Sequence, residues 1–285
     1  MCKCFGQPYC RAFFLWLLLL AAGPAMSDQD RTYILARAPQ LSPATLKQQW
    51  LPILERIKQE TGIRIGLKLY GSRSKFETDL FDGGPDFAFM NPYYAVLAKK
   101  RHGYIPLLRD SAHELTGIVV VRKDADIQDV HELNGKTLVF PDANAMGASL
   151  YPRAVLTEIE HLNFTAEYVG THENVYRTVL LGKYIAGSGV KSTLSREPEE
   201  LRSQLRILYT TPGIPPHPLI AHPRVPKEVR DAVTQSLLGM ANDEAGRKLL
   251  ARVKLNNPVK VEFARDYGAL ENLGLEKYMN PPLPY

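Results

Sequence analysis

The most informative stretch of this sequence is Thr137-Leu-Val-Phe-Pro-Asp-Ala-Asn-Ala-Met-Gly-Ala-Ser-Leu150. Its first four residues predict a short buried strand, and the residues from Gly147 onward predict an amphipathic helix. The turn between them leaves the first N–H groups of the helix without intrahelical acceptors, at the positive end of the helix dipole. Such a terminus suits an anion or a carbonyl oxygen. An ordinary turn capped by Asn144 explains the same residues, so the rest of the chain has to decide between the two readings.

Strands alternate with helices along most of the chain. Apolar alternation and β-branched runs predict strands at 32–36, 63–69, 86–90, 118–122, 137–140, 166–169, 184–190 and 206–209. Apolar residues at helical spacing predict helices at 43–61, 75–81, 92–102, 127–133, 147–161, 173–182 and 197–205, and three more that begin near 227, 243 and 264. This alternation predicts an α/β fold with mostly parallel sheets flanked by helices.

The first 26 residues have the pattern of a cleaved secretory signal peptide. Lys3 and Arg11 form its basic start, residues 12–22 are apolar, and small residues precede Ser27. The apolar run is shorter than the roughly 20 residues of a membrane-spanning helix. All three cysteines of the sequence lie in this segment, so we expect a mature protein without disulfides or thiolate chemistry, exported to the periplasm.

Charge and motifs argue against several classes of function. The full chain has 35 basic and 30 acidic residues, and the basic ones are scattered instead of forming the stripe that nucleic-acid binding requires. The seven histidines lack the spacing of a helical metal site, and no Gly-x-Ser-x-Gly or other catalytic motif is present. We therefore expect no enzyme, no cofactor and no nucleic-acid partner. A metal site built from His172, His217 and Met146 remains an alternative.

The segment Thr211-Pro-Gly-Ile-Pro-Pro-His-Pro218 is stiff and poor in helix formers. It is a natural crossing between two lobes, and residues 115–121 are its expected counterpart. These crossings predict one lobe from residues 27–116 and 215–285 and a second from residues 117–214. A ligand cleft would lie between them, outside the carboxyl ends of the strands.

Five short motifs occur in an order that is shared with a known family. They are Asn91-Pro-Tyr-Tyr, Gly117-Ile-Val-Val-Val-Arg-Lys, Leu133-Asn-Gly-Lys136, Phe140-Pro-Asp-Ala-Asn-Ala-Met-Gly147 and Gly170-Thr-His172. Together they resemble the phosphate/phosphite/phosphonate-binding (PhnD-like) proteins of ABC transporters, over about residues 31–240. The resemblance implies a type II periplasmic-binding fold with two lobes, and a protein that captures a small solute and hands it to a membrane permease.

The resemblance also implies where the ligand binds. The family's Ser/Thr-rich turn corresponds here to Asn144, Ala145 and Met146, followed by the matching Gly147, so the backbone donors remain and the hydroxyls are lost. The family's cleft histidine matches His172. An acidic residue that contacts a ligand amine in the family is replaced by Ile185, which argues against an aminoalkylphosphonate. The expected ligand is an oxyanion or an oxygen-rich organic molecule.

Four further residues are candidates for the ligand site. Tyr93 and Tyr94 lie at a strand-to-helix junction and Tyr70 ends a strand, so an aromatic ring there can cover a ligand, although core packing explains such residues equally well. Arg177 lies one helical turn after His172 and can clamp an oxyanion, or it is a surface arginine. His217 and His222 flank the second crossing and are expected to have structural roles.

A sensor subunit that docks on a membrane histidine kinase would have the same binding chemistry as a transport protein. The partner, an ABC permease or a kinase, distinguishes the two. The protein is expected to be a monomer in either case.

Overall fold

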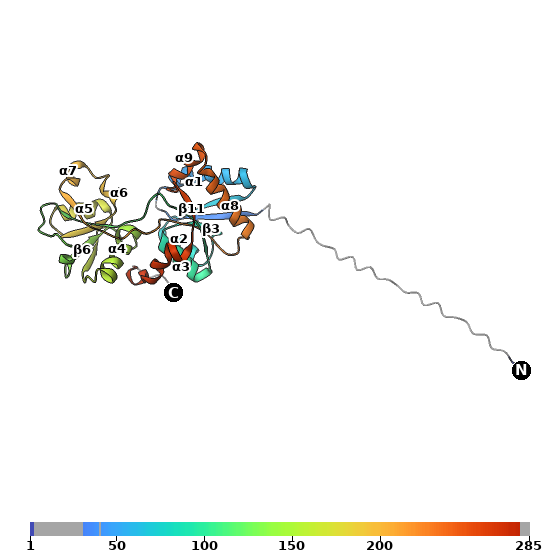
Figure 1. Cartoon of the computed structure of the whole chain (residues 1–285), viewed down its shortest axis with the longest axis horizontal. Coiled ribbons are helices and arrows are strands. Elements are labelled where there is room, and N and C mark those ends of the chain that lie inside the picture. Colours follow the sequence, from blue (N-terminus) through green and yellow to red (C-terminus); the bar gives the residue numbers. More distant parts are fainter. Residues whose placement is uncertain (3–30, 40, 280–285) are drawn as a thin grey trace. The chain divides into compact units, whose positions relative to one another are not determined.

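The computed structural model describes residues 1–2, 31–39 and 41–279. The predicted signal peptide, with Cys4 and Cys10, lies almost entirely outside the described residues. All described helices and strands belong to one compact unit, Thr32–Tyr285 (Figure 1). Among the described helices, none has the length and apolar character needed to span a bilayer.

The first sheet has six strands in the order β11-β4-β10-β3-β1-β2. Its strands are β1 (Thr32–Arg37), β2 (Arg64–Leu69), β3 (Phe87–Phe89), β4 (Ile105–Asp110), β10 (Leu219–Ala221) and β11 (Pro258–Lys260). The helices associated with it are α1 (Pro43–Thr61), α2 (Arg73–Phe81), α3 (Pro92–His102), α8 (Lys227–Met240), α9 (Glu244–Arg252), α10 (Phe263–Asn272) and the 3-10 helix η5 (Leu275–Tyr278).

The second sheet has five strands in the order β7-β6-β8-β5-β9. Its strands are β5 (Ile118–Arg122), β6 (Thr137–Phe140), β7 (Thr165–Tyr168), β8 (Ala186–Gly189) and β9 (Leu205–Thr210). The helices are η2 (Val130–Leu133), η3 (Met146–Leu150), α4 (Tyr151–Ala154), η4 (Val155–Ile159), α5 (His172–Leu180), α6 (Lys191–Leu194) and α7 (Glu199–Arg202). The helix predicted at 127–133 is reduced to η2, and the one predicted at 197–205 to α7.

Both sheets are mixed, so the expectation of mostly parallel sheets is corrected. Strands β1, β2 and β3 are parallel to one another, as are β6, β7 and β8, but β10 and β5 run antiparallel to their neighbours. The reason lies in the register. Leu219 begins β10 opposite Phe89, the last residue of β3, and Ile118 begins β5 opposite Gly189, the last residue of β8. Each incoming strand enters its sheet at the carboxyl ends of its neighbours and must run the opposite way.

The two segments that connect the sheets pair with each other. Leu115 and Ile214 exchange two backbone hydrogen bonds, of 2.8 and 3.1 Å. Two residues further on, the Gly117 amide donates to Thr211 Oγ1 (2.8 Å) and the Thr211 amide donates to the Gly117 carbonyl (2.9 Å). The two predicted crossings therefore lie side by side. The division into lobes at residues 116/117 and 214/215 remains a prediction.

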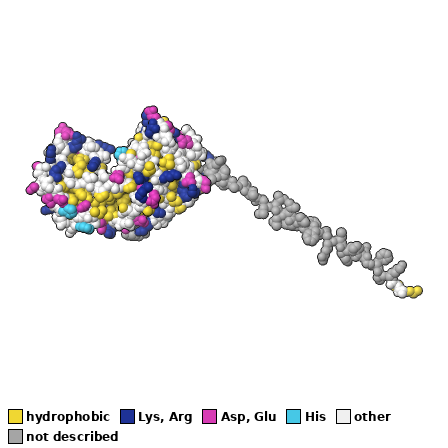
Figure 2. Space-filling view, in the orientation of Figure 1, with side chains coloured by type: hydrophobic (Ala, Val, Ile, Leu, Met, Phe, Trp, Pro, Cys, Tyr) yellow, Lys and Arg dark blue, Asp and Glu magenta, His cyan; other side chains and the backbone are white. Residues whose placement is uncertain are grey.

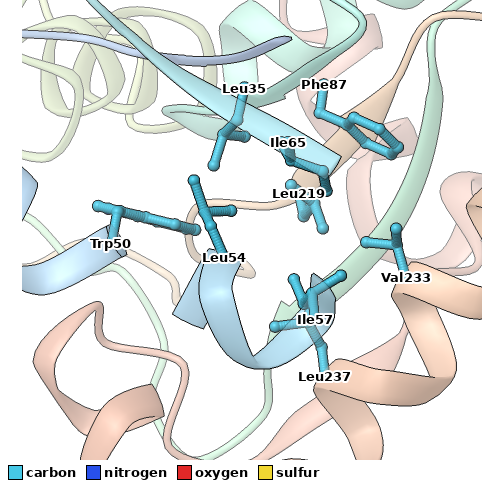
Figure 3. Close-up of a pocket in the computed structure, with 9 residues that line it drawn as sticks. All are labelled: Leu35, Trp50, Leu54, Ile57, Ile65, Phe87, Leu219, Val233 and Leu237. Carbon is cyan, nitrogen blue, oxygen red and sulfur yellow. The ribbon is translucent and has the colours of Figure 1, made fainter. Parts of the chain in front are cut away.

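Apolar clusters cover both faces of each sheet. In β5, Val119 and Val121 join one cluster while Ile118 and Val120 join the other, as the two-residue period of a strand requires. Beneath α1, nine apolar side chains line a void of about 10 Å³ (Figure 3). This space is near the lower limit for one water molecule and its lining is apolar, so it is a packing defect and not a solute site.

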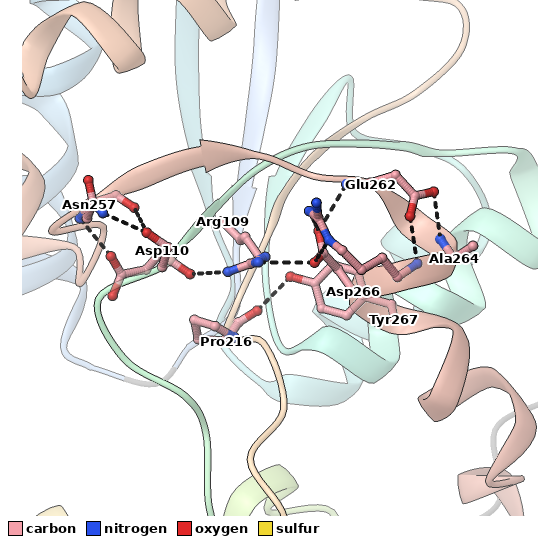
Figure 4. A network of polar contacts seen from close by, with 10 residues as sticks. Arg109, Asp110, Pro216, Asn257, Glu262, Ala264, Asp266 and Tyr267 are labelled. Carbon is pink, nitrogen blue, oxygen red and sulfur yellow. Dashed lines mark hydrogen bonds and ion pairs between the residues drawn. The ribbon is translucent and has the colours of Figure 1, made fainter.

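A polar network fixes α10 to β4 (Figure 4). Arg109 donates to Asp266 (3.0 Å), and Arg265 makes two further bonds of 2.8 Å with the same carboxylate. Burial alone would raise the pKa of Asp266, but the hydrogen bonds from Arg265 and Arg109 outweigh it and hold the pKa below its usual range. The adjacent Asp110 accepts from the Asn257 amide (2.7 Å), which joins β11 to the same edge.

Candidate functional site

The turn after β6 is held by local hydrogen bonds and leads directly into a helix. Asp142 accepts from the Asn144 amide through its side chain (2.9 Å) and from the Ala145 amide through its carbonyl (3.2 Å). Its carboxylate also pairs with Arg73 of α2, at 3.3 Å. Asn144 does not cap the helix that follows: the N-cap is Ala145, whose methyl group cannot accept a hydrogen bond.

The helix start is therefore uncapped and buried. Within the described residues, no side chain caps η3, and Met146, Gly147 and Ala148 of its first turn are buried. The first intrahelical donors are the amides of Ser149 and Leu150, both of which bond to the Ala145 carbonyl. Buried first-turn amides without a capping side chain need another acceptor, and an anion or a water molecule supplies one.

Gly147 lies where three parts of the chain meet. A Cβ on it would be 2.8 Å from Leu115 of the first connecting segment and 3.2 Å from Val190, which follows β8. Gly117 approaches from the other side, since its own Cβ would lie 2.7 Å from the Gly147 carbonyl oxygen. The absence of a side chain at Gly147 therefore allows close packing of the helix start against the connecting segments.

A buried arginine lies behind the turn. Arg153 of α4 donates to the Ala143 carbonyl (2.6 Å), to Ser149 Oγ (3.2 Å) and to the Tyr278 carbonyl (2.5 Å). Its guanidinium also contacts the aromatic rings at the ends of β6 and β7, those of Phe140 and Tyr168. No carboxylate among the described residues pairs with it, and burial lowers the pKa of Arg153. Its charge adds to the positive potential at the helix start.

His172 is the first residue of α5 and is half-buried. Its Nδ1 lies 3.2 Å from Thr193 Oγ1, and that hydroxyl also contacts the Val190 carbonyl (2.9 Å) and the Tyr176 hydroxyl (2.7 Å). Burial lowers the pKa of His172, which favours the neutral imidazole. Because Val190 also packs against Gly147, His172 and the helix start lie around the carboxyl ends of β6 and β8.

The three predicted tyrosines already have partners in helices that are associated with the first sheet. Tyr93 and Tyr94 are both buried, and their hydroxyls donate to Glu276 and Glu77 respectively. The Tyr70 hydroxyl donates to Asp79, and its ring packs edge-on against Phe76. Burial raises the pKa of Tyr70 and Tyr94 above the usual range. Each tyrosine has a packing role in this structure.

Arg177 and Ile185 lie apart from this group. Arg177 forms an exposed ion pair with Glu173, one turn before it on the same helix. Ile185 immediately precedes β8, so it lies at the opposite end of that strand from Val190, in an open groove of about 420 Å³. The expectation that Ile185, in place of an acidic residue, disfavours an aminoalkylphosphonate stays a prediction.

Two histidines of the second crossing region are structural, as expected. His217 is stacked on Phe89 with ring centroids 6.1 Å apart, and burial with the nearby charges of Arg37 and Lys254 lowers its pKa to about 3. His222 Nδ1 accepts from the Arg224 amide at 3.0 Å. Searching the described part of the chain for three clustered His, Cys, Asp or Glu side chains finds no candidate metal site.

Sequence reasoning missed Arg153. The available signal was a single arginine in the otherwise apolar run from Met146 to Leu156, where an arginine must be either exposed or bonded internally. Over the face shown in Figure 2, basic and acidic side chains are interspersed. Arg153 adds a buried positive charge behind the helix start, away from these surface charges.

Comparison with known proteins matches this arrangement to one family. Residues 35–271 match the family described as ABC transporter, phosphonate, periplasmic substrate-binding protein. Among solved structures, XAC2383 from Xanthomonas citri bound to chloride ion is 20% identical, with a TM-score of 0.73 over 87% of this chain and 98% of that one. PhnD1 from Prochlorococcus marinus in complex with methylphosphonate is 16% identical, with a TM-score of 0.65 over 85% and 97%.

A binding protein component of an ABC phosphonate transporter from Pseudomonas aeruginosa is 15% identical, with a TM-score of 0.64 over 85% of each chain. These likenesses confirm the predicted two-lobed periplasmic-binding fold. The family match confirms the predicted resemblance.

Proposed function

Because this chain belongs to the periplasmic phosphonate-binding family of ABC-transporter substrate-binding proteins, we propose that it captures a small oxyanion of the phosphate or phosphonate class. It then delivers this solute to a membrane permease. The family consists of substrate-binding proteins and not of enzymes. The observation that carries the proposal is the buried, uncapped helix start at Met146, with Arg153 behind it.

The anion would accept hydrogen bonds from the amides of Met146, Gly147 and Ala148. A phosphoryl oxygen at a helix N-terminus gains both from these donors and from the helix dipole. Arg153 does not contact the ligand in this proposal, because its donors bond to carbonyl and hydroxyl oxygens of the protein. It contributes charge, and it fixes the turn through the Ala143 carbonyl.

His172 would make binding depend on the protonation state of the ligand. The Thr193 hydroxyl has one proton, and the Val190 carbonyl at 2.9 Å can only accept it. The Tyr176 hydroxyl (2.7 Å) and His172 Nδ1 (3.2 Å) are then left to donate to Thr193 Oγ1, which assigns the proton of a neutral His172 to Nδ1. Nε2 is then an acceptor. It favours a ligand that still has a P–OH group, such as hydrogen phosphate or a monoanionic phosphonate, over sulfate, which has no proton at neutral pH.

A capping variant tests the site without damaging the fold. Ala145→Asp places a carboxylate at the N-cap, which supplies the missing acceptor and repels an anion. The matched control is Pro226→Asp at the N-cap of α8, which also has no side-chain cap. A ligand at about 100 times its Kd adds about 2.7 kcal/mol, or roughly 5–10 °C in Tm.

The ligand panel is phosphate, phosphite, methylphosphonate, 2-aminoethylphosphonate, sulfate and acetate. The proposal expects at least one phosphorus oxyanion to raise the Tm of the parent protein and of Pro226→Asp but not that of Ala145→Asp. A panel without any such rise, or an unchanged rise in Ala145→Asp, would overturn it.

The sensor alternative predicts the same binding and differs only in the partner. Uptake of the bound oxyanion that requires this protein together with a permease supports the transport role. Binding without uptake, combined with ligand-dependent activation of a histidine kinase, would replace it.

A further inference from the structure

A second buried arginine lies at the end of β1, away from the turn after β6. Arg37 is only 6% exposed, and its Nη1 donates to the carbonyl of Phe89, the last residue of β3. Its guanidinium carbon lies 4.8 Å from the ring centre of Phe89 and 5.3 Å from that of Trp50 in α1. The two rings are themselves 5.1 Å apart, so the three groups pack against one another.

This cluster has more donors than acceptors. Arg37 Nε and Trp50 Nε1 are both buried without a hydrogen-bond partner among the described residues. Buried N–H groups are nearly always paired in proteins, and leaving one unpaired costs about 1–3 kcal/mol. Because the two side chains pack against each other, one acceptor can serve both donors.

The net charge of the cluster is positive, which also indicates a missing acceptor. Within the described residues, no carboxylate pairs with Arg37, and the positive charges of Arg37 and Lys254 both act on the adjacent His217. His217 is itself neutral, since its pKa is lowered to about 3. Burial lowers the pKa of Arg37 to about 9, which still leaves it charged at neutral pH. A buried cation without a counter-charge is strongly destabilising, so the missing acceptor should be negative.

We propose that Arg37 and Trp50 hold a small monovalent inorganic anion of halide size. It would accept the Nε–H of Arg37 and the Nε1–H of Trp50 and neutralise the guanidinium. The site is buried against α1 and would hold its ion as part of the fold, so it is independent of the oxyanion site proposed above. The ion would strengthen the corner where Phe89 meets the second crossing, because the Met90 amide donates there to the Pro218 carbonyl.

Fluorescence of the full-length protein tests this proposal, because the chain has two tryptophans, Trp16 and Trp50. Trp16→Phe leaves Trp50 as the single indole. This parent is titrated with sodium bromide against sodium gluconate at constant ionic strength. Saturable quenching of Trp50 emission, together with a higher Tm in chloride than in gluconate, is expected. Equal Tm values in the two salts and no saturable quenching would overturn the proposal and assign a water molecule to the site.

Two variants make the result specific to this site. Arg37→Met in the same background keeps the bulk and removes the charge and the Nε donor, so the saturable quenching should be lost. Arg202→Met, at an exposed arginine of α7, is the matched control and should keep it. Should Arg37→Met not fold, Trp50→Phe is compared with the parent by Tm alone, and it should lose most of the chloride-dependent rise. A rise that both variants retain contradicts the assignment.

Discussion

The carbonyl oxygen of Gly147 lies 2.7 Å from the position that a Cβ on Gly117 would occupy. One of these glycines belongs to the first segment that connects the sheets, and the other to the uncapped helix start. Pro152, on the next turn of that helix, is closer still, at 2.4 Å from the same position. The geometry of the candidate anion site therefore depends on how closely the connecting segment approaches it.

Gly117→Ala should cost stability and binding together. The new methyl would overlap Pro152 and the Gly147 carbonyl, and overpacking of this kind costs about 1–3 kcal/mol. Because the helix start must shift, oxyanion affinity should fall as well. Gly239→Ala in α8 is the control: it faces open space, and alanine there should stabilise by about 0.5–1 kcal/mol. Denaturant unfolding measures the loss of stability, and ligand titration measures the loss of affinity. If Gly117→Ala had the stability and affinity of the parent protein, the close contact of Gly117 with Pro152 and Gly147 would be contradicted.

Arg153→Met should destabilise the fold by roughly 2–4 kcal/mol. It leaves the Ala143 and Tyr278 carbonyls without their donor and removes the aromatic contacts of the guanidinium. The turn before Met146 should loosen, so that oxyanion binding weakens more than the loss of charge alone predicts. The exposed Arg202→Met should stay within about 0.5 kcal/mol of the parent. Equal effects of the two substitutions on unfolding would show that Arg153 does not hold the turn.

His217 should make the protein sensitive to acid. Its folded-state pKa is about 3, whereas an unfolded histidine titrates near 6.5, so the unfolded chain binds more protons between these values. The contribution of His217 to the free energy of unfolding is fully present above about pH 6.5. It falls as the pH drops toward 3, and about 2 kcal/mol is lost at pH 5.

His217→Gln should flatten that part of the curve of unfolding free energy against pH. Identical slopes in the parent and in His217→Gln between pH 6.5 and 4 would refute the assignment.

His172→Ala should weaken oxyanion binding about tenfold, the effect of one hydrogen bond. If Nε2 accepts a ligand P–OH, affinity for methylphosphonate in the parent should decline as the pH rises through the second ionisation of the ligand. The variant should lose this dependence. Isothermal titration at several pH values measures it, and a parent affinity that increases with ligand charge would contradict the acceptor role.

The sequence predicted the parts of the fold that depend on local pattern. The buried strands β1, β5 and β6 and the helices with clear caps, such as α3 after Asn91, lie where the residues indicated. The missed strands are β4, β10 and β11. Two of them have only three residues, and β4 and β11 contain the prolines Pro106 and Pro258, which argue against a strand. Because these three form the antiparallel pairs of the first sheet, missing them made it look parallel.

In the candidate site, too, the features that depend on local sequence were predicted and those that depend on distant residues were not. The turn and Gly147 were identified because a strand, a turn and a helix start are neighbours in sequence. The roles of Arg37 and Arg153 were not, since an arginine is buried or exposed according to which distant carbonyls and rings surround it. For Tyr93 and Tyr94, the sequence position beside a helix start is compatible with a ligand contact. In the structure their hydroxyls donate to Glu276 and Glu77, two contacts that the sequence pattern does not indicate.

The pairing of the two connecting segments has a mechanical consequence. Four hydrogen bonds join Leu115 and Gly117 to Ile214 and Thr211, so the chain passes between the sheets as a two-stranded ribbon. A ribbon bends easily across its flat face and resists shear along its length, since shear would break every rung at once. Any relative movement of the two sheets is then restricted to bending about one axis. The amides of Leu115 and Ile214 should accordingly remain protected from hydrogen exchange throughout that movement.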